Sequence, residues 1–406
     1  MSQQKSLPTR HPDFIRAVLD RSVKMISEGQ LNSAEVLLET LSGESSVIEQ
    51  VAFLRGVVSM GLGQRKRAQR FLKTALEVNP HNAQAHGILG DALLEDQAAQ
   101  AVAAFVAALT LDPDNSDWNI GLGKALMKCG LDDLAYDNFV DARIPDAANT
   151  TPRSESDILE ESGWSNLSAL DRSVLCDALF AEATRHQARR QHGRAGKIFR
   201  HLLTIDASHY LALGSVAVLE HQCGNSERAT QMIVQMTRRL NDGDLLPVER
   251  LRGRLSLIET CVAIGDFATA RDHIAAALAE APEEAEVPAT CAIALFNMGA
   301  ARESLIFFEK AIALNQLQST NFYCTLGSAL MSINEPRRAE IAFQHAAALA
   351  PELKSAHRGL LESYIAQNRF AEAETELEKS FDDPTDPAFK EFQKRLQDAS
   401  ATSAGS

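Results

Sequence analysis

The sequence predicts an all-α fold, a right-handed superhelix (solenoid) of about ten helical hairpins. Three observations support this prediction. Aromatic residues make up only 6% of the chain and alanine is abundant, which favours closely packed helices. An apolar pattern recurs with a nearly constant period of 34 residues, and residues that end helices recur in step with it. A fixed period of this length is typical of helical repeat proteins.

The recurring pattern consists of a small residue, an apolar residue four positions later and a further anchor seven positions later. This spacing places all three on one face of a helix. The small residues are Ala34, Ala68, Ala101, Ala135, Ala195, Ala229, Ala270, Ser304, Ala339 and Ala373. The apolar residues four positions later are Leu38, Leu72, Phe105, Phe139, Phe199, Ile233, Ile274, Phe308, Phe343 and Leu377. We expect each set to form the packed interior of one hairpin.

Turn residues stand five positions before most of the small residues. They are Gly29, Gly63, Gly130, Gly224, Gly265, Gly299, Asn334 and Asn368. Gly and Asn tolerate the left-handed conformation that ends a helix. Prolines, which cannot continue a helix, follow four of the units at positions 80, 113, 282 and 351. Each unit is therefore predicted to be a helix A, a tight turn, a helix B and a break.

This pattern closely resembles the tetratricopeptide repeat family, whose repeat has the same length. The Leu-Gly pair of the family's helix A is matched by Leu122-Gly123 and Leu326-Gly327, and its helix A tyrosine only by Tyr364. The family's helix B run is matched by Ala101-Phe105-Ala108-Pro113 and Ala339-Phe343-Ala346-Pro351. The resemblance implies a superhelix whose concave groove, lined by helix A residues, binds an extended peptide or a helix.

The spacings also predict how the chain is divided. Residues 12–145 hold four units and residues 171–386 hold six. A spacing of 60 in place of 34 leaves 26 extra residues within about Pro145 to Leu170, and residues 146–170 are assigned as the insert. This insert is interpreted as a linker, or alternatively as a segment that blocks the groove through Ile158, Leu159 and Trp164. Residues 387–399 are predicted to form an amphipathic capping helix. Residues 1–11 and 400–406 are expected to be disordered.

The resemblance directs the search for a binding site to helix A residues that point away from helix B. The candidates for partner binding are Lys124, Arg252, Glu259, Asn321, Ser328, Arg358 and Glu362. A basic patch for an acidic partner or a phosphate is suggested by Arg185, Arg189, Arg190 and Arg194, at the turn of the fifth unit. In both cases the alternative is an ordinary solvated surface.

Several function classes find no support in the sequence. The net charge of −14 argues against general nucleic-acid binding. There is no Gly-rich phosphate loop, nucleophile elbow or His-Glu-x-x-His motif, so no catalytic, cofactor or metal residue is assigned. The six cysteines form no Cys-x-x-Cys pair and are expected to be reduced thiols that fill spaces between helices. The polar start and the lack of a membrane-length apolar stretch favour a cytoplasmic protein.

These observations predict a non-enzymatic scaffold or adaptor that binds a protein or peptide segment in its groove. A ligand- or peptide-responsive regulatory sensor is the second hypothesis. A phosphate or nucleic-acid binder that uses the strip from Arg185 to Arg200 is the third. The identity of the partner and the formation of a homo-oligomer stay open.

Overall fold

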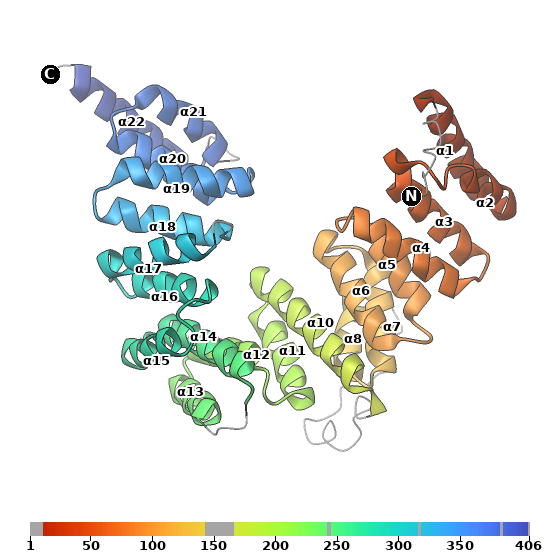
Figure 1. The fold of residues 1–406 in the computed structure, drawn as a ribbon, viewed down its shortest axis with the longest axis horizontal. Coiled ribbons are helices and arrows are strands. Elements are labelled where there is room, and N and C mark those ends of the chain that lie inside the picture. The colour runs from red at the N-terminus through yellow and green to blue at the C-terminus, as the bar shows by residue number, and fades with distance from the viewer. Residues whose placement is uncertain (1–10, 143–165, 242–244, 316–317, 382–384, 405–406) are drawn as a thin grey trace, which may run out of the picture. The chain divides into compact units, whose positions relative to one another are not determined.

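The computed structural model describes residues 11–142, 166–241, 245–315, 318–381 and 385–404. Within these ranges the regular elements are α-helices and one short 3₁₀ helix, Ser45–Val47 (Figure 1). The predicted all-α fold is therefore confirmed. The residues proposed to block the groove, Ile158, Leu159 and Trp164, lie outside the described ranges, as does the predicted disordered start up to residue 10.

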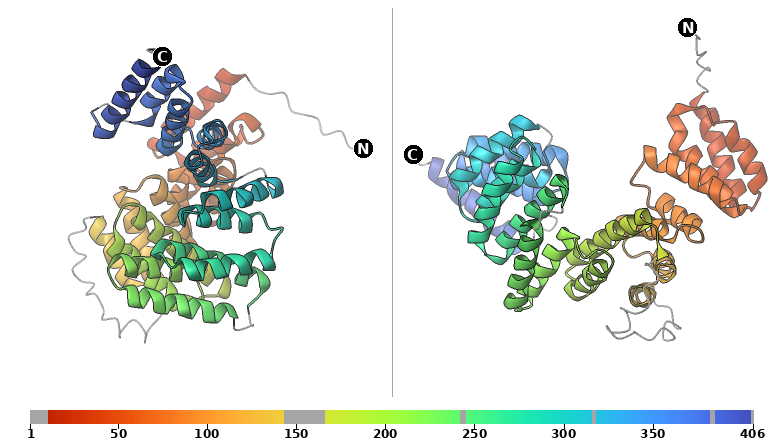
Figure 2. Two further views of the ribbon diagram at one scale, coloured as in Figure 1. Left: turned by 90° about the vertical axis from the view of Figure 1, so that its left-hand side faces the viewer. Right: turned by 60° about the horizontal axis from the view of Figure 1, so that its bottom comes forward.

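The chain folds into two compact units, Met1–Ala212 and Leu213–Ser406, shown from two further sides in Figure 2. The first unit holds five helix pairs. They are α1 (Pro12–Ser27) and α2 (Leu31–Glu39), α3 (Ile48–Gly61) and α4 (Arg65–Val78), α5 (Ala83–Leu93) and α6 (Ala98–Leu111), α7 (Ser116–Lys128) and α8 (Asp132–Asp141), and α10 (Ala169–Ala188) and α11 (His192–Ile205). The predicted division at 146–170 thus differs from the compact units, which divide after Ala212.

Five further pairs follow, the first of which begins at the boundary between the units. They are α12 (Tyr210–Gln222) and α13 (Ser226–Asn241), α14 (Pro247–Ile264) and α15 (Phe267–Glu280), α16 (Glu286–Asn297) and α17 (Ala301–Leu314), α18 (Thr320–Ser332) and α19 (Pro336–Leu349), and α20 (Lys354–Ala366) and α21 (Phe370–Ser380). A last helix, α22 (Pro387–Ala404), continues past the predicted end at residue 399.

The predicted anchors form the interior of every hairpin. Each of the ten small residues is at most 1% exposed. The phenyl ring of Phe105 shows why small residues are needed. A Cβ atom on Gly90 of the same hairpin would lie 2.8 Å from this ring, and one on Gly121 of the next helix A would lie 2.4 Å from it. Glycine at these two positions therefore lets one ring fill the space between three helices.

The predicted turn residues adopt the left-handed conformation in all eight cases, with φ between 58° at Asn368 and 85° at Gly224. The fifth hairpin has no Gly or Asn at this place and uses Arg190, with φ of 60°. The helices before the four prolines end two residues earlier, as at Val78 before Pro80. A residue in the left-handed conformation therefore forms the turn even in the hairpin that has no Gly or Asn at this position.

The C-terminal helix packs as the predicted cap. Leu396 of α22 is 3% exposed and Phe389 and Phe392 pack against the core of the second unit. The rings of Phe381 and Phe389 lie 5.8 Å apart, edge to face. One expectation about cysteines is wrong: Cys223, at the turn after α12, is exposed and fills no space between helices.

Candidate functional site

The helix A face of the second unit is the first candidate site. Its helices α14, α16, α18 and α20 contact one another in that order, and Figure 1 shows the last three stacked in a row. The six predicted groove residues of this unit are all exposed on these helices. They are Arg252 and Glu259 on α14, Asn321 and Ser328 on α18, and Arg358 and Glu362 on α20. The repeat therefore brings these polar side chains onto consecutive helices.

The carboxylates of this face are affected by their surroundings. Burial, together with the neighbouring carboxylate of Glu286 on α16, raises the pKa of Glu259. Two acidic side chains from neighbouring A helices are therefore close enough to repel each other. A basic group placed between them would relieve this repulsion.

Side-chain contacts also connect α18 with α20 at the C-terminal end of this face and hold Arg358. Burial raises the pKa of the Cys324 thiol on α18, and a hydrogen bond with Ser355 on α20 opposes this shift. The Arg358 guanidinium carbon lies 4.4 Å from the centre of the Phe381 ring, and its Nε donates to the Ser380 carbonyl oxygen at 3.4 Å. Arg358 is therefore held in place and not freely extended.

Lys124 lies in the other compact unit, exposed on α7. It neighbours Asp91 on α5, whose pKa is raised by burial and by Asp117 although the charge of Lys124 lowers it. Lys124 is thus on a helix A of the first unit, whereas the other six candidates are on helices of the second.

The predicted basic patch does not form one surface. Arg185 is nearly buried and donates to Glu182 through Nε at 2.9 Å and Nη2 at 2.6 Å. Arg189 pairs with Asp114 at 2.8 Å, and Arg190 is the exposed left-handed turn residue. Arg194 points into a pocket. Two of the four charges are therefore balanced by carboxylates of the chain itself.

A junction that the sequence did not reveal explains these placements. Helix α10 packs on α6, so that the fifth hairpin joins the array on a second side of α6. Helix α6 contains no charged residue and is buried around its circumference, with Val102 at 0% and Val106 at 3% exposure. An apolar helix of this kind must be covered on all sides. In the sequence, the absence of charged residues between 98 and 111 is the one feature that indicates such a fully covered helix.

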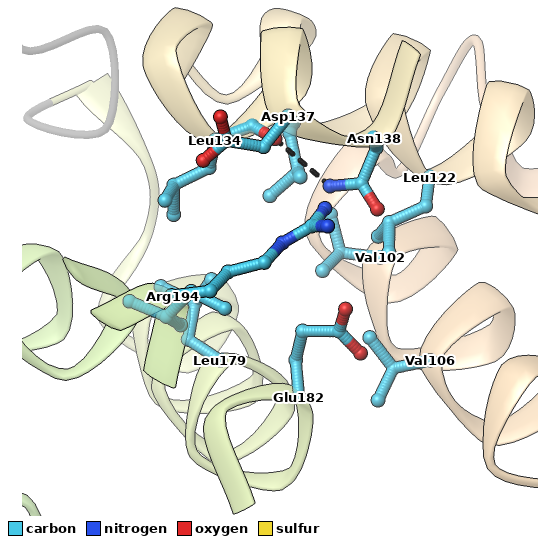
Figure 3. A pocket seen from close by; sticks show the side chains of 11 residues that line it. Val102, Val106, Leu122, Leu134, Asp137, Asn138, Leu179, Glu182 and Arg194 are labelled. Atoms are coloured by element: carbon cyan, nitrogen blue, oxygen red, sulfur yellow. Dashed lines mark hydrogen bonds between the residues drawn. The ribbon is translucent and has the colours of Figure 1, made fainter. Parts of the chain in front are cut away.

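The junction encloses a pocket with an unusual polar lining (Figure 3). Val102, Val106, Leu122 and other apolar side chains form its wall, and the Arg194 side chain extends from α11 into it. The other polar residues that line it are Asp137, Asn138 and Glu182. The Asn138 side-chain nitrogen donates to the Leu134 carbonyl oxygen at 2.8 Å.

Glu182 is the centre of a buried ionic cluster beside this pocket. It is 3% exposed, and its carboxylate also pairs with Nε2 of His186 at 2.9 Å. Burial by itself would raise the pKa of Glu182, but the hydrogen bonds from His186 and Arg185 lower it to about 2. The cluster therefore holds a carboxylate charged in the interior, where α10 meets α6.

Two other features are absent from the residues that the structure describes. No group of three or more His, Cys, Asp or Glu side chains in the described ranges could hold a metal ion. Among the described helices, none combines the length and the apolar character needed to cross a membrane.

The helices and their interior define a class of protein, an all-α array of stacked hairpins. Comparison with known families identifies the repeat. The family model "Tetratricopeptide repeat" matches residues 53–100 and 324–387. The resemblance seen in the sequence is thereby confirmed, and these two stretches of the chain match the tetratricopeptide repeat family. Proteins of this family are in general scaffolds for protein–protein interaction and generally non-catalytic.

Solved structures give weaker likenesses. The crystal structure of the APC/C hetero-tetramer Cut9–Hcn1 is 16% identical, with a TM-score of 0.43, and the match covers 93% of this chain and 83% of that one. Yeast Tom70 is 13% identical, with a TM-score of 0.42, covering 97% and 96%. A tetratricopeptide repeat protein from Parabacteroides merdae is 15% identical, with a TM-score of 0.39, covering 78% and 98%. No curated protein sequence matches the chain.

Proposed function

We propose that the chain is a non-enzymatic adaptor that binds a segment of a partner protein along the helix A face of its second unit. The observation that carries this proposal is the continuous order α14, α16, α18 and α20, with exposed polar side chains on three of these helices. Because successive A helices contact one another, a single extended segment or helix can touch all four.

The side chains suggest how such a segment is recognised. The Asn321 amide and the Ser328 hydroxyl can hydrogen-bond the main chain of a bound peptide. Glu259, whose pKa is raised partly by Glu286, is suited to a Lys or Arg side chain of the partner. Arg358, held over Phe381, is suited to a carboxylate. The preferred partner segment therefore carries a basic and an acidic group in this order along the face.

A peptide display screen against the whole chain, followed by affinity measurements on the selected peptides, tests this proposal. The decisive variant is Arg252→Glu combined with Arg358→Glu. Its matched control is Arg302→Glu combined with Arg337→Glu, which makes the same charge change at exposed positions of the B helices α17 and α19. We expect the groove variant to weaken binding at least about tenfold, which is about 1.4 kcal/mol, and the control to bind like the unaltered chain.

Equal losses in the two variants would show that net charge, and not the helix A face, governs binding. A steep loss of affinity with salt for a phosphate-bearing ligand would instead favour the phosphate-binding hypothesis. The same assay tests the insert. Deletion of residues 150–165 should raise affinity if this segment blocks the groove, and leave affinity unchanged if it is a linker.

We also propose a reducing, cytoplasmic compartment. All six cysteines are free, and four of them are buried between helices. Thiols persist where the cell keeps them reduced. A fluorescent fusion of the chain found in an oxidising compartment would contradict this assignment.

A further inference from the structure

The fourth hairpin, α7 and α8, lacks the neighbour that the repeat would give it. In seven other units helix B contacts the helix A of the next unit, as α4 contacts α5, α6 contacts α7 and α19 contacts α20. After α8 the next described helix, α10, packs on α6. Helix α11 reaches α8 through side chains such as Lys197, whose Nζ lies 2.9 Å from Asp137. The end of the hairpin therefore does not receive α10 as its next helix A.

The exposure of the anchors reflects this arrangement. Nine of the ten apolar anchors are at most 6% exposed, whereas Phe139 of α8 is only partly buried. Met127 of α7 is 43% exposed, whereas Leu94, its counterpart in the preceding unit when Gly90 is aligned with Gly123, is partly buried. Met331 and Ile365, at the same place in later units, are partly buried. Phe139 and Met127, which we call the end face, thus expose more apolar surface than the corresponding residues of these units.

The array itself shows what covers such an anchor. Phe343 lies between Gly327 of its own hairpin and Gly359 of the following helix A, α20, where an added Cβ atom would come within 2.3 Å of the ring. Phe105 lies between two glycines in the same way. Phe139 packs on Gly123 of its own hairpin, where a Cβ atom would lie 2.6 Å from the ring. Within the described residues, no second glycine approaches it.

We propose that the end face of the fourth hairpin is a docking surface for an amphipathic helix of a partner protein. The partner helix takes the place of a helix A and presents a small residue, glycine or alanine, to the Phe139 ring. The surface continues the interface that joins the units of the array, so the occupant needs the same chemistry as α7 or α20. This site belongs to the first unit and is independent of the helix A face of the second.

The probe for this proposal is a synthetic peptide of α20, Lys354–Ala366, the helix that covers Phe343. An isolated helix of this length is only marginally stable, so the peptide is stapled between positions 358 and 362, which are exposed in the chain. Fluorescence anisotropy measures its binding to the full chain. We expect Met127→Glu and Phe139→Ala each to weaken binding at least about tenfold, and Val78→Glu, at an exposed position of α4, to leave it unchanged.

A peptide with Gly359→Phe is the matched control on the ligand, because its side chain would meet the Phe139 ring; it should not bind. Several outcomes would overturn the proposal. The peptide fails to bind the unaltered chain at about 1 mM, or binds Met127→Glu and Phe139→Ala as tightly as the unaltered chain. Binding only after deletion of residues 146–164 would assign the end face to the insert. If the chain forms a dimer and Met127→Glu disrupts this dimer, the end face binds a second copy of the chain and the proposal is wrong.

Discussion

Replacement of Glu182 by alanine should detach the fifth hairpin from α6. The carboxylate is 3% exposed and accepts hydrogen bonds from Arg185 and His186. Its pKa of about 2, compared with an ordinary value of 4.5, corresponds to about 3–4 kcal/mol of stability at pH 7, at about 1.4 kcal/mol for each pKa unit. Removing one partner of a buried ion pair costs about 3–5 kcal/mol, which is the same range.

Hydrogen exchange of the α10 amides measures this effect locally, as suits an array that can open one part at a time. A loss of about 3 kcal/mol lowers protection by roughly two orders of magnitude. The control is Glu303→Ala, which removes an exposed pair with Arg271 at 3.3 Å and should cost less than about 1 kcal/mol. Protection of α10 in Glu182→Ala within about threefold of the unaltered chain would refute the reasoning.

The pH dependence provides a second check on the same group. Because the pKa of Glu182 is lowered in the folded chain, its contribution is complete above the ordinary value of 4.5 and is lost as the pH falls toward about 2. In Glu182→Gln this acid-induced loss at α10 should disappear, after correction for intrinsic exchange rates. An equal loss in both proteins would show that another group is responsible.

Three further predictions concern packing, thiols and the helix A face. Gly121→Ala should lower the free energy of unfolding by about 1–3 kcal/mol, because the new Cβ would lie 2.4 Å from the Phe105 ring. Gly193→Ala in α11, where the added Cβ meets open space, should raise the free energy of unfolding by about 0.5–1 kcal/mol. Urea denaturation of the two variants measures both changes. Burial raises the pKa of three thiols to about 12, those of Cys129, Cys261 and Cys291. Iodoacetamide at pH 8 should therefore modify the exposed Cys223 and leave these three unmodified, and mass spectrometry measures the result. The pKa of Glu259 is raised in the folded chain, so the folded state loses stability as the pH rises through this pKa and the carboxylate becomes charged. Glu259→Gln should therefore raise the thermal midpoint at pH 7 and leave it unchanged below pH 4.5. No change at pH 7 would contradict the repulsion from Glu286.

The hairpins could be predicted from the sequence because their determinants are local. The spacing of Ala339, Phe343 and Ala346 fixes one helix face, and Asn334 fixes the turn before it, where φ is 64°. Arg190 shows the limit of this approach. It adopts the left-handed conformation, with φ of 60°, although the residue type does not favour it.

The candidate site was predictable only in part. Exposure of Asn321 or Arg358 follows from the helix register, so these positions were found. The basic patch required knowledge of contacts between distant segments, such as Arg189 with Asp114, which no periodicity contains. Glu182 lies three and four residues before Arg185 and His186, so helical spacing indicated the pairing, but not the burial that α6 imposes.

The packing of the fifth hairpin against α6 buries the Glu182 cluster and leaves the end face of the fourth hairpin open. Proteolytic cleavage at a site engineered between residues 146 and 164, followed by size-exclusion chromatography at micromolar concentration, tests it directly. We predict that the two fragments stay together in the unaltered chain and separate in Glu182→Ala. Separation of the fragments of the unaltered chain would contradict the account.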